Sequence, residues 1–271
     1  MKKALIPVYL LLILILPSII SGLPFLIATT TTIMIMYLGF LPLRYAFCFV
    51  LIADLLSIPH QKAIIPGKLK KSMDDPVYAH RRLYGICWTA VYYFKPIYWL
   101  FLSVPELKFF LFRLFGYKDY MDFTIYPDTW IRDLPLLDFG KNSYMSNSAT
   151  IGINIVSDDG FIKVDRIKIG KNSLIGHPAL IALDSKLGDN CEVGVSTRIG
   201  IKVTINNGTV LGPASIINHG ATIQENSKIG TACNIGTLSR VDKNIKYKIT
   251  PYSKQDRGLI HRMMRTDYQY T

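Results

Sequence analysis

The fold is decided by residues 169–241, IGKNSLIGHPALIALDSKLGDNCEVGVSTRIGIKVTINNGTVLGPASIINHGATIQENSKIGTACNIGTLSRV. Glycine directly follows eight of its aliphatic residues, and a small or β-branched residue stands four positions after nearly every one. The aliphatic residues recur at every sixth position without a gap: Ile169, Ile175, Ile181, Leu187, Val193, Ile199, Ile205, Leu211, Ile217, Ile223, Ile229, Ile235 and Val241.

A period of six fits neither an α-helix, which repeats near 3.6, nor a single long strand, which repeats at 2. It fits a repeat in which each hexad forms a short strand and a turn. Each hexad then buries its aliphatic residue, places the small residue beside it, and gives the strained corner to glycine or asparagine. Three hexads make one rung of a triangular prism, and parallel rungs stack about 4.8 Å apart. The stretch therefore predicts a mainly β protein built on a parallel β-helix.

The aliphatic-Gly-x-x-small-x hexad resembles the left-handed β-helix of hexapeptide-repeat acyltransferases. The left hand is taken from this resemblance, because it opposes the usual right-handed crossover. The resemblance also implies homotrimers with active sites between adjacent prisms. It implies an acyl thioester, such as acetyl-CoA, as the donor.

Four further segments share one family layout: PGK at 66–68, FFLFRLFGYKDY at 109–120, TWIRDLPLLDFGKNSYMSNSATIGINIV at 129–156, and DDGFIKVDRIKIG at 158–170. Together they resemble the membrane-bound C-terminal acyltransferase-like domain of ε-poly-L-lysine synthetase-type peptide synthetases. Those proteins carry three such domains in tandem, with paired transmembrane helices. A single-domain chain would reproduce that layout by forming a homotrimer. The family's Thr-His pair falls near Ile153 and Asn154, so its histidine is absent here.

The N-terminal residues predict a transmembrane segment within residues 1–60. No charged residue occurs between Ala4 and Leu43, which is about twice the ~20 residues that span a bilayer. Gly22 and Pro24 interrupt the run and predict two helices, at 4–21 and 24–40. A cleaved signal peptide is the alternative, although no Ala-x-Ala site occurs. The next apolar run, 45–58, is short for a span, so we expect an interfacial or re-entrant helix or a continuation of the second helix.

Residues 61–135 form a predicted juxtamembrane region that is basic and then aromatic. Basic residues after a membrane segment place that side in the cytoplasm, so we expect an integral membrane protein with its β-helix on the cytoplasmic face. The basic run either contacts anionic lipid of the bilayer or is a solvated linker. The aromatic residues of 88–115 predict short helices lying on the membrane, and an ordinary soluble helical subdomain is the alternative.

The predicted β-helix domain covers residues 136–245. Within it, Ser157 and Lys163 replace the aliphatic residue, so 154–166 is expected to loop out or form an irregular coil. Residues 246–271 are a basic tail that either caps the open end of the prism or stays a tail. A nucleic-acid partner is not expected, because no recognisable nucleic-acid fold accompanies the basic charge. The formal net charge of the chain is +12.

Acyl transfer needs a base for the acceptor proton and donors for the oxyanion. His219, in INHGA, is the first candidate, because Ile217–Gly220 resembles the segment that carries the base in serine and sugar-nucleotide acetyltransferases. His177, in IGHPA, is the second. The two lie on different faces about two rungs apart, roughly 10 Å, so they meet only across a subunit interface. Asp158 and Asp159 either orient the base or acceptor, or are solvated loop carboxylates.

Arg198, Lys202 and Arg240 are candidates for binding coenzyme A phosphates, with simple solvation as the alternative. No metal is expected, because no cluster of cysteine and histidine has metal-ligand spacing. The sequence thus predicts a membrane-bound acyltransferase, transferring an acetyl group from acetyl-CoA, or another acyl thioester, to a small molecule, glycan or lipid-linked sugar. The alternatives are amide-bond formation from an aminoacyl thioester on a carrier protein, and an inactive membrane-anchored trimeric scaffold.

Overall fold

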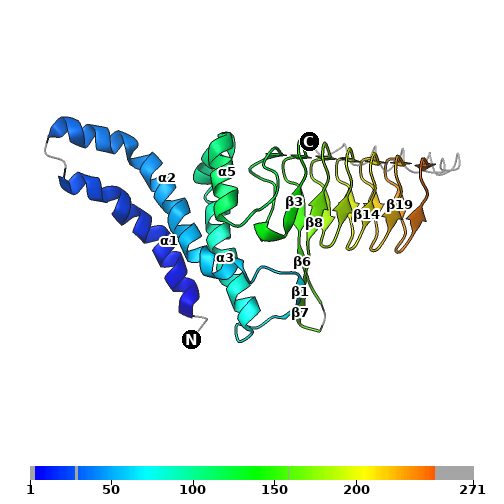
Figure 1. The fold of residues 1–271 in the computed structure, drawn as a ribbon, viewed down its shortest axis with the longest axis horizontal. Helices are drawn as coiled ribbons and strands as arrows, with labels where there is room; N and C mark the ends of the chain where they lie inside the picture. Colours follow the sequence, from blue (N-terminus) through cyan, green and yellow to red (C-terminus); the bar gives the residue numbers. More distant parts are fainter. Residues whose placement is uncertain (1–3, 28–29, 158, 248–271) are drawn as a thin grey trace, which may run out of the picture.

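The structure is a computed structural model that describes residues 4–27, 30–157 and 159–247. The chain begins in a helical part and continues into an elongated stack of strands (Figure 1). The helical part contains two long helices and three shorter ones: α1 (Leu5–Gly22), α2 (Thr31–Gln61), α3 (Pro76–Tyr93), α4 (Lys95–Ser103) and α5 (Pro105–Leu114). The predicted tail after residue 247 lies outside the described residues.

Helices α1 and α2 form a hairpin at one end of the molecule (Figure 1). Both are long and apolar enough to cross a membrane, with mean hydropathies of 2.4 and 1.9. The turn between them includes the short 3-10 helix η2 (Leu23–Ile27), so the second helix starts at Thr31, later than the sequence suggested. Thr30 caps it by accepting a hydrogen bond from the Ile33 amide at 3.3 Å. Of the alternatives for 45–58, the structure shows the continuation, because α2 runs without a break to Gln61.

The aromatic region forms short helices, as the sequence suggested, and most of its rings lie in a packed core; the position of these helices on the membrane stays a prediction. Trp88 is fully buried, and its ring packs edge-on against Tyr98, Phe112 and Phe115. The reason is that these rings seal the base of the prism, where the first rung would otherwise expose its apolar interior. Only a few aromatic side chains of this region are well exposed: Tyr93, Phe94, Trp99 and Phe109.

The strands form a parallel β-solenoid of about six turns with three faces. The seven-stranded face contains β2 (Thr124–Ile125), β4 (Tyr144–Met145), β9 (Leu174–Ile175), β12 (Glu192–Val193), β15 (Val210–Leu211), β18 (Lys228–Ile229) and β21 (Lys246–Tyr247). The five-stranded face contains β5 (Thr150–Gly152), β10 (Leu180–Ala182), β13 (Arg198–Ile199), β16 (Ile216–Ile217) and β19 (Asn234–Ile235). The six-stranded face contains β3 (Leu137–Phe139), β8 (Ile167–Ile169), β11 (Lys186–Leu187), β14 (Thr204–Ile205), β17 (Thr222–Ile223) and β20 (Arg240–Val241).

The hexad pattern describes the interior of this solenoid. The aliphatic residues from Ile169 to Ile235 are exposed by 3% or less, and Val241 is half-buried at the end. The small residues beside them link successive rungs, because their hydroxyls donate to backbone carbonyls fifteen residues further on. Ser173 bonds Gly188 and Ser185 bonds Gly200, each at 2.9 Å. The handedness of the coil stays a prediction from the resemblance.

The repeat glycines do not occupy the strained corners. Every sixth residue from Asp184 to Asn244 has a left-handed backbone, and the expected glycine or asparagine stands at five of these corners: Asn190, Gly208, Gly220, Asn226 and Asn244. The repeat glycines stand where two rungs approach closely: a Cβ at Gly170 would collide with the backbone of Gly188. Their role is therefore space between rungs, not backbone freedom.

The expected irregular segment does loop out of the solenoid. It forms an antiparallel hairpin of β6 (Asn154–Val156) and β7 (Phe161–Val164), which leaves the prism between the five-stranded and six-stranded faces. Strand β1 (Gly67–Lys70), which follows α2, pairs with β7. The hairpin therefore connects the end of the second long helix to the base of the prism (Figure 1).

A buried ion pair joins α3 to the first rung of the solenoid, just before the short 3-10 helix η3 (Leu134–Leu136). Arg81 donates from Nε to Asp133 at 2.7 Å, and both side chains are at most 4% exposed. Arg132 approaches the other oxygen of Asp133 at 3.4 Å. Burial lowers the pKa of Arg81, and the charge of Asp133 opposes that shift. The first rung starts at β2, before the predicted start at residue 136. The sequence did not reveal this start, because the residues of β2 lack the hexad spacing.

Candidate active site

The two candidate histidines lie on different edges of the prism. His177 follows β9, on the edge where the seven-stranded face turns into the five-stranded face, which we name the His177 edge. His219 follows β16, on the edge between the five-stranded and six-stranded faces, named the His219 edge. Both side chains are exposed. Within one protomer the structure does not bring them together.

His219 caps the rung that precedes it. Its Nδ1 accepts a hydrogen bond from the Ile201 amide at 2.9 Å, and its ring lies over Gly200, where a Cβ would be 2.7 Å from Nδ1. Asp189 and Asn207 cap equivalent amides on another edge, also eighteen residues back. Because Nδ1 is an acceptor, neutral His219 carries its proton on Nε2. Its outer nitrogen is then a donor with no lone pair for an incoming proton.

His177 has the opposite hydrogen-bond arrangement. Its Nδ1 lies 2.5 Å from the carbonyl oxygen of Asn147 in the preceding rung, and a carbonyl only accepts, so Nδ1 donates. The neutral ring then carries a lone pair on Nε2. This is the tautomer that a general base needs, with the ring held by its other nitrogen.

The corner of His177 also differs from the other corners of the repeat. The residue three positions after each aliphatic has positive φ throughout 184–244, and at Asn172. Pro178 occupies that position after Ile175, and proline holds φ near −65°. The backbone at the His177 corner therefore departs from the repeat. The same corner carries the imidazole whose Nε2 lone pair is free.

Exposed aliphatic side chains surround the His177 edge. Leu174 lies on the strand before the corner, Leu180 on the strand after it, and Val195 one rung further along the edge. Ile216 continues the five-stranded face. These four are exposed by 40–51%. Exposed Arg198 lies between Leu180 and Ile216, so the exposed surface beside His177 is apolar with one cation in it.

The three basic candidates are divided between the faces. Arg198 lies on the five-stranded face, paired in register with Leu180 and Ile216. Lys202 lies on the His219 edge, one rung before His219, and Arg240 lies on the six-stranded face beside Thr222. All three side chains are exposed. Arg198 is thus the one that shares a patch with the aliphatic residues near His177.

Among the described residues, the contacts of the remaining acidic candidate, Asp159, are with Lys68 and Phe161 and not with His177 or His219. Asp158 lies outside the described residues. Asp159 is in the turn of the hairpin, where it pairs with Lys68 at 2.5 Å and accepts from the Phe161 amide. The hydrogen bond from Lys68, followed by that from the Phe161 amide, lowers the pKa of Asp159. These contacts hold the turn together; a catalytic role for Asp159 stays a prediction.

Two buried cysteines are poorly suited to act as nucleophiles. Burial raises the pKa of Cys87 to about 12, and it also raises the pKa of Cys191. Both therefore stay protonated thiols at neutral pH. Among the described residues, no group of three or more acidic, cysteine or histidine side chains is placed to hold a metal ion.

Two other histidines, His60 and His80, lie against each other in the helical part. His60 at the end of α2 accepts or donates toward Tyr9 at 2.8 Å through Nε2, and its Nδ1 lies 2.7 Å from Nδ1 of His80 on α3. The three residues link α1, α2 and α3. No spacing in the sequence could have shown this, because the contacts join residues 20 and 51 positions apart.

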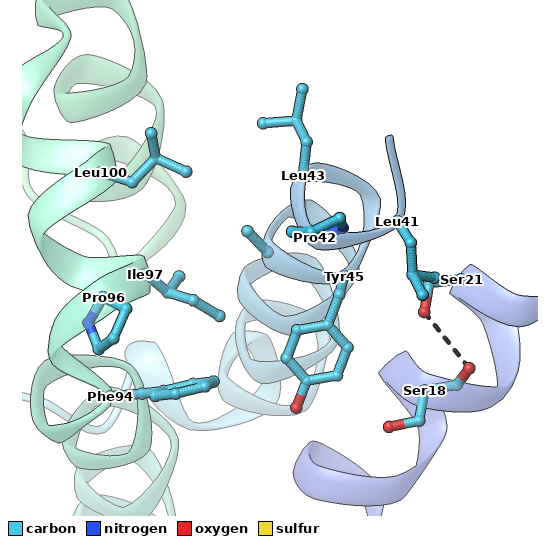
Figure 2. A pocket seen from close by; sticks show the side chains of 11 residues that line it. Ser18, Ser21, Leu41, Pro42, Leu43, Tyr45, Phe94, Pro96, Ile97 and Leu100 are labelled. Atoms are coloured by element: carbon cyan, nitrogen blue, oxygen red, sulfur yellow. Dashed lines mark hydrogen bonds between the residues drawn. The ribbon is translucent and has the colours of Figure 1, made fainter. Parts of the chain in front are cut away.

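A large pocket of about 690 Å³ lies between the two long helices and α4. Figure 2 shows that its wall is mostly apolar, with Leu43, Ile97 and Leu100 facing the space. The Ser21 hydroxyl is occupied by the backbone carbonyls of Pro17 and Ser18. The pocket suits a hydrocarbon chain and offers no base for acyl transfer.

Comparisons with solved structures return acyltransferases at low similarity. PerB from Caulobacter crescentus, in complex with CoA and GDP-perosamine, is 17% identical over 46% of this chain and 51% of that chain, with a TM-score of 0.29. The UDP-N-acetylglucosamine acyltransferase of Francisella novicida is 16% identical over 48% and 55%, with a TM-score of 0.40. AntD, an N-acyltransferase from Bacillus cereus with dTDP and coenzyme A, is 12% identical over 51% and 86%, with a TM-score of 0.27.

This chain spans about half the length of the first two of these proteins. No protein-family model matches the sequence, and a search of curated proteins found no match. At these identities and TM-scores the comparisons do not decide the activity. The residues of this chain have to carry that argument.

Proposed function

We propose that this protein is a membrane-bound acyltransferase, and that His177 is its general base. The observation that carries the proposal is the tautomer of His177, which leaves a lone pair on an exposed nitrogen at the one corner where Pro178 interrupts the repeat. The acceptor hydroxyl or amine would give its proton to Nε2 as it attacks the thioester carbonyl. The carbon–sulfur bond then breaks, and the protonated His177 returns the proton to the thiolate.

The donor is proposed to be acetyl-CoA or a related acyl thioester. Arg198 supports this, because its guanidinium is exposed beside the His177 edge and can pair with a phosphate of coenzyme A. Lys202, on the His219 edge, and Arg240, on the six-stranded face, lie away from the His177 edge, so a role for them in binding coenzyme A stays a prediction. In the catalysed step the chain contributes orientation, charge and the two proton transfers of His177. It needs no metal for these roles.

Helices α1 and α2 are proposed to anchor the protein in a bilayer, with the solenoid in the cytoplasm. The support is their exposed apolar surface: Leu11, Leu14, Ile35 and Leu38 are each more than half exposed. The buried residues of α2 are confined to Ala46 and beyond, where it packs on the rest of the protein. An acceptor near the membrane, such as a glycan or lipid-linked sugar, fits this placement.

The aliphatic patch around the His177 edge is proposed to be the interface of a homotrimer. Leu174, Leu180, Val195 and Ile216 are the exposed side chains that a second copy would cover. Such an interface would place the neighbouring prism against His177 and close the site to bulk water.

The proposal predicts release of free CoA thiol when the detergent-purified protein meets acetyl-CoA and an acceptor. Release should depend on added glycan or lipid-linked sugar, and mass spectrometry should find the acylated product. Turnover of a carrier-bound aminoacyl thioester instead would favour amide-bond formation. If neither thioester is consumed with any acceptor class, the protein is a scaffold and the proposal is wrong.

A further inference from the structure

A small basic pocket lies where α3, the hairpin and the first rung of the solenoid meet. Its volume is about 150 Å³. The residues that line it include four cations and no carboxylate: Lys71, Tyr78, Arg81, Arg82, Arg132, Asn154 and Ile162. Tyr78 and Asn154 add neutral hydrogen-bonding groups. This composition is that of a site for an oxyanion such as phosphate.

The charge of the pocket is only partly neutralised. Asp133 is fully buried behind it and pairs with Arg81 and Arg132. Two of the buried nitrogens, one Nη of Arg81 and the Nε of Arg132, make no hydrogen bond. Both approach Asp133 only as ion-pair contacts. One carboxylate therefore faces four cations, which leaves a surplus of positive charge and hydrogen-bond donors at a site that is partly shielded from water.

An apolar groove continues directly from this pocket. Arg82 and Arg132 line both, and the groove, of about 320 Å³, is otherwise lined by Leu10, Gly85, Ile86, Thr89, Ala90 and Tyr93. The guanidinium of Arg132 lies against α3 at Gly85, where a Cβ would collide with it. The groove reaches α1 at Leu10, one of the exposed apolar residues of the first long helix. A cationic pocket thus opens onto an apolar path along a helix proposed to lie in the bilayer.

We propose that this pocket and groove bind a phosphate-bearing anionic lipid of the membrane. The phosphate lies among Lys71, Arg81, Arg82 and Arg132, and the first part of the acyl chain lies in the groove beside Leu10. The bound lipid fixes the height of the solenoid base relative to the bilayer surface. The inference rests on the membrane placement proposed above, and it does not depend on acyl transfer.

Native mass spectrometry of the full-length protein in detergent tests this inference. We expect the wild-type protein to retain phosphatidylglycerol in preference to phosphatidylcholine. Changing both Lys71 and Arg82 to glutamine should weaken phosphatidylglycerol binding by at least about tenfold, because each basic side chain near a lipid phosphate contributes to affinity. Lys186→Gln with Lys228→Gln removes two exposed cations from the outer faces of the prism, and should leave binding unchanged.

Two further arms separate lipid from free phosphate. Thr89→Trp should fill the groove and weaken lipid binding, and millimolar inorganic phosphate should compete only weakly with the lipid. Equal retention of both lipids by the wild type would overturn the inference, as would unchanged binding in the Lys71/Arg82 variant. So would phosphate binding that is as tight as lipid binding. If the glutamine variant fails to fold, the charge-preserving variant Lys71→Arg with Arg82→Lys takes its place. We expect this variant to keep lipid binding. A failure here leaves the thiol-release assay unaffected.

Discussion

Replacing His177 with alanine should lower kcat for acyl transfer by about 10²–10⁴-fold, the usual contribution of a positioned general base. The change removes the Nε2 lone pair that is proposed to take the acceptor proton. It also removes the hydrogen bond to the Asn147 carbonyl, which is exposed and can bond to water instead. The thermal unfolding midpoint should therefore change little. The measurement is steady-state thiol release with acetyl-CoA, alongside a melting curve for each variant.

His219 supplies the matched control for this experiment. His219→Asn should keep nearly full activity, because asparagine can cap the Ile201 amide as Asn207 caps Asp189. His219→Ala should instead lose about 1 kcal/mol of stability, because the exposed cap bond is gone. A large loss of kcat in His219→Asn, with normal rates in His177→Ala, would reverse the assignment of the base.

Replacing Asp133 with alanine should destabilise the protein by about 3–5 kcal/mol, because it leaves buried Arg81 without its counter-charge. Asp133 is also the residue with a left-handed backbone that precedes the short helix η3 at the base of the prism. The measurement is the denaturant midpoint of the solenoid transition, followed by tryptophan fluorescence. Trp88, which donates to the Ile131 carbonyl at 2.8 Å, reports on this junction.

The exposed pair of Lys68 and Asp159 is the control for the buried one. Its side chains are 57% and 47% exposed, so Lys68→Ala should cost no more than about 1 kcal/mol. The double change of Arg81→Met with Asp133→Leu should recover much of the loss of Asp133→Ala, because the fully buried cation is removed with its partner and only the partly exposed Arg132 loses its counter-charge. If Asp133→Ala lowers the free energy of unfolding no more than Lys68→Ala does, the pair of Arg81 and Asp133 does not hold the junction.

The interior of the solenoid could be predicted from the sequence because its spacing is a local property. Each inward aliphatic such as Ile199 is set by its own hexad, and no contact with distant residues is needed to place it. The base of the prism could not be predicted in this way. It depends on the pairing of Arg81 with Asp133 and of Trp88 with the Ile131 carbonyl, which are 52 and 43 positions apart and follow no period.

The neighbours of the repeat glycines and of the aromatic residues could not be predicted from the sequence, for one physical reason. A sequence pattern shows that Gly170 or Phe112 belongs to an element, but it does not show which neighbour the residue meets. Gly170 meets the backbone of the next rung, and Phe112 meets Trp88 and Tyr117. The packing role of such residues is therefore visible only once the fold is known.

The sequence also could not show which of the two histidines is the better candidate for the base. Both occupy the same phase of the hexad, so the sequence placed both on outer corners, where the structure finds them. The difference between them is the partner of Nδ1: an amide for His219 and a carbonyl for His177. That partner belongs to an adjacent rung, and its identity required the register of the rungs.

Photoaffinity labelling with a photoreactive coenzyme A derivative tests the central claim most directly. Peptide mapping by mass spectrometry locates the label on the purified protein. We expect saturable labelling within residues 174–198, around His177 and Arg198, that acetyl-CoA competes away. Label confined to residues 217–222 around His219, or label that acetyl-CoA does not displace, would contradict the assignment of the thioester site to the His177 edge.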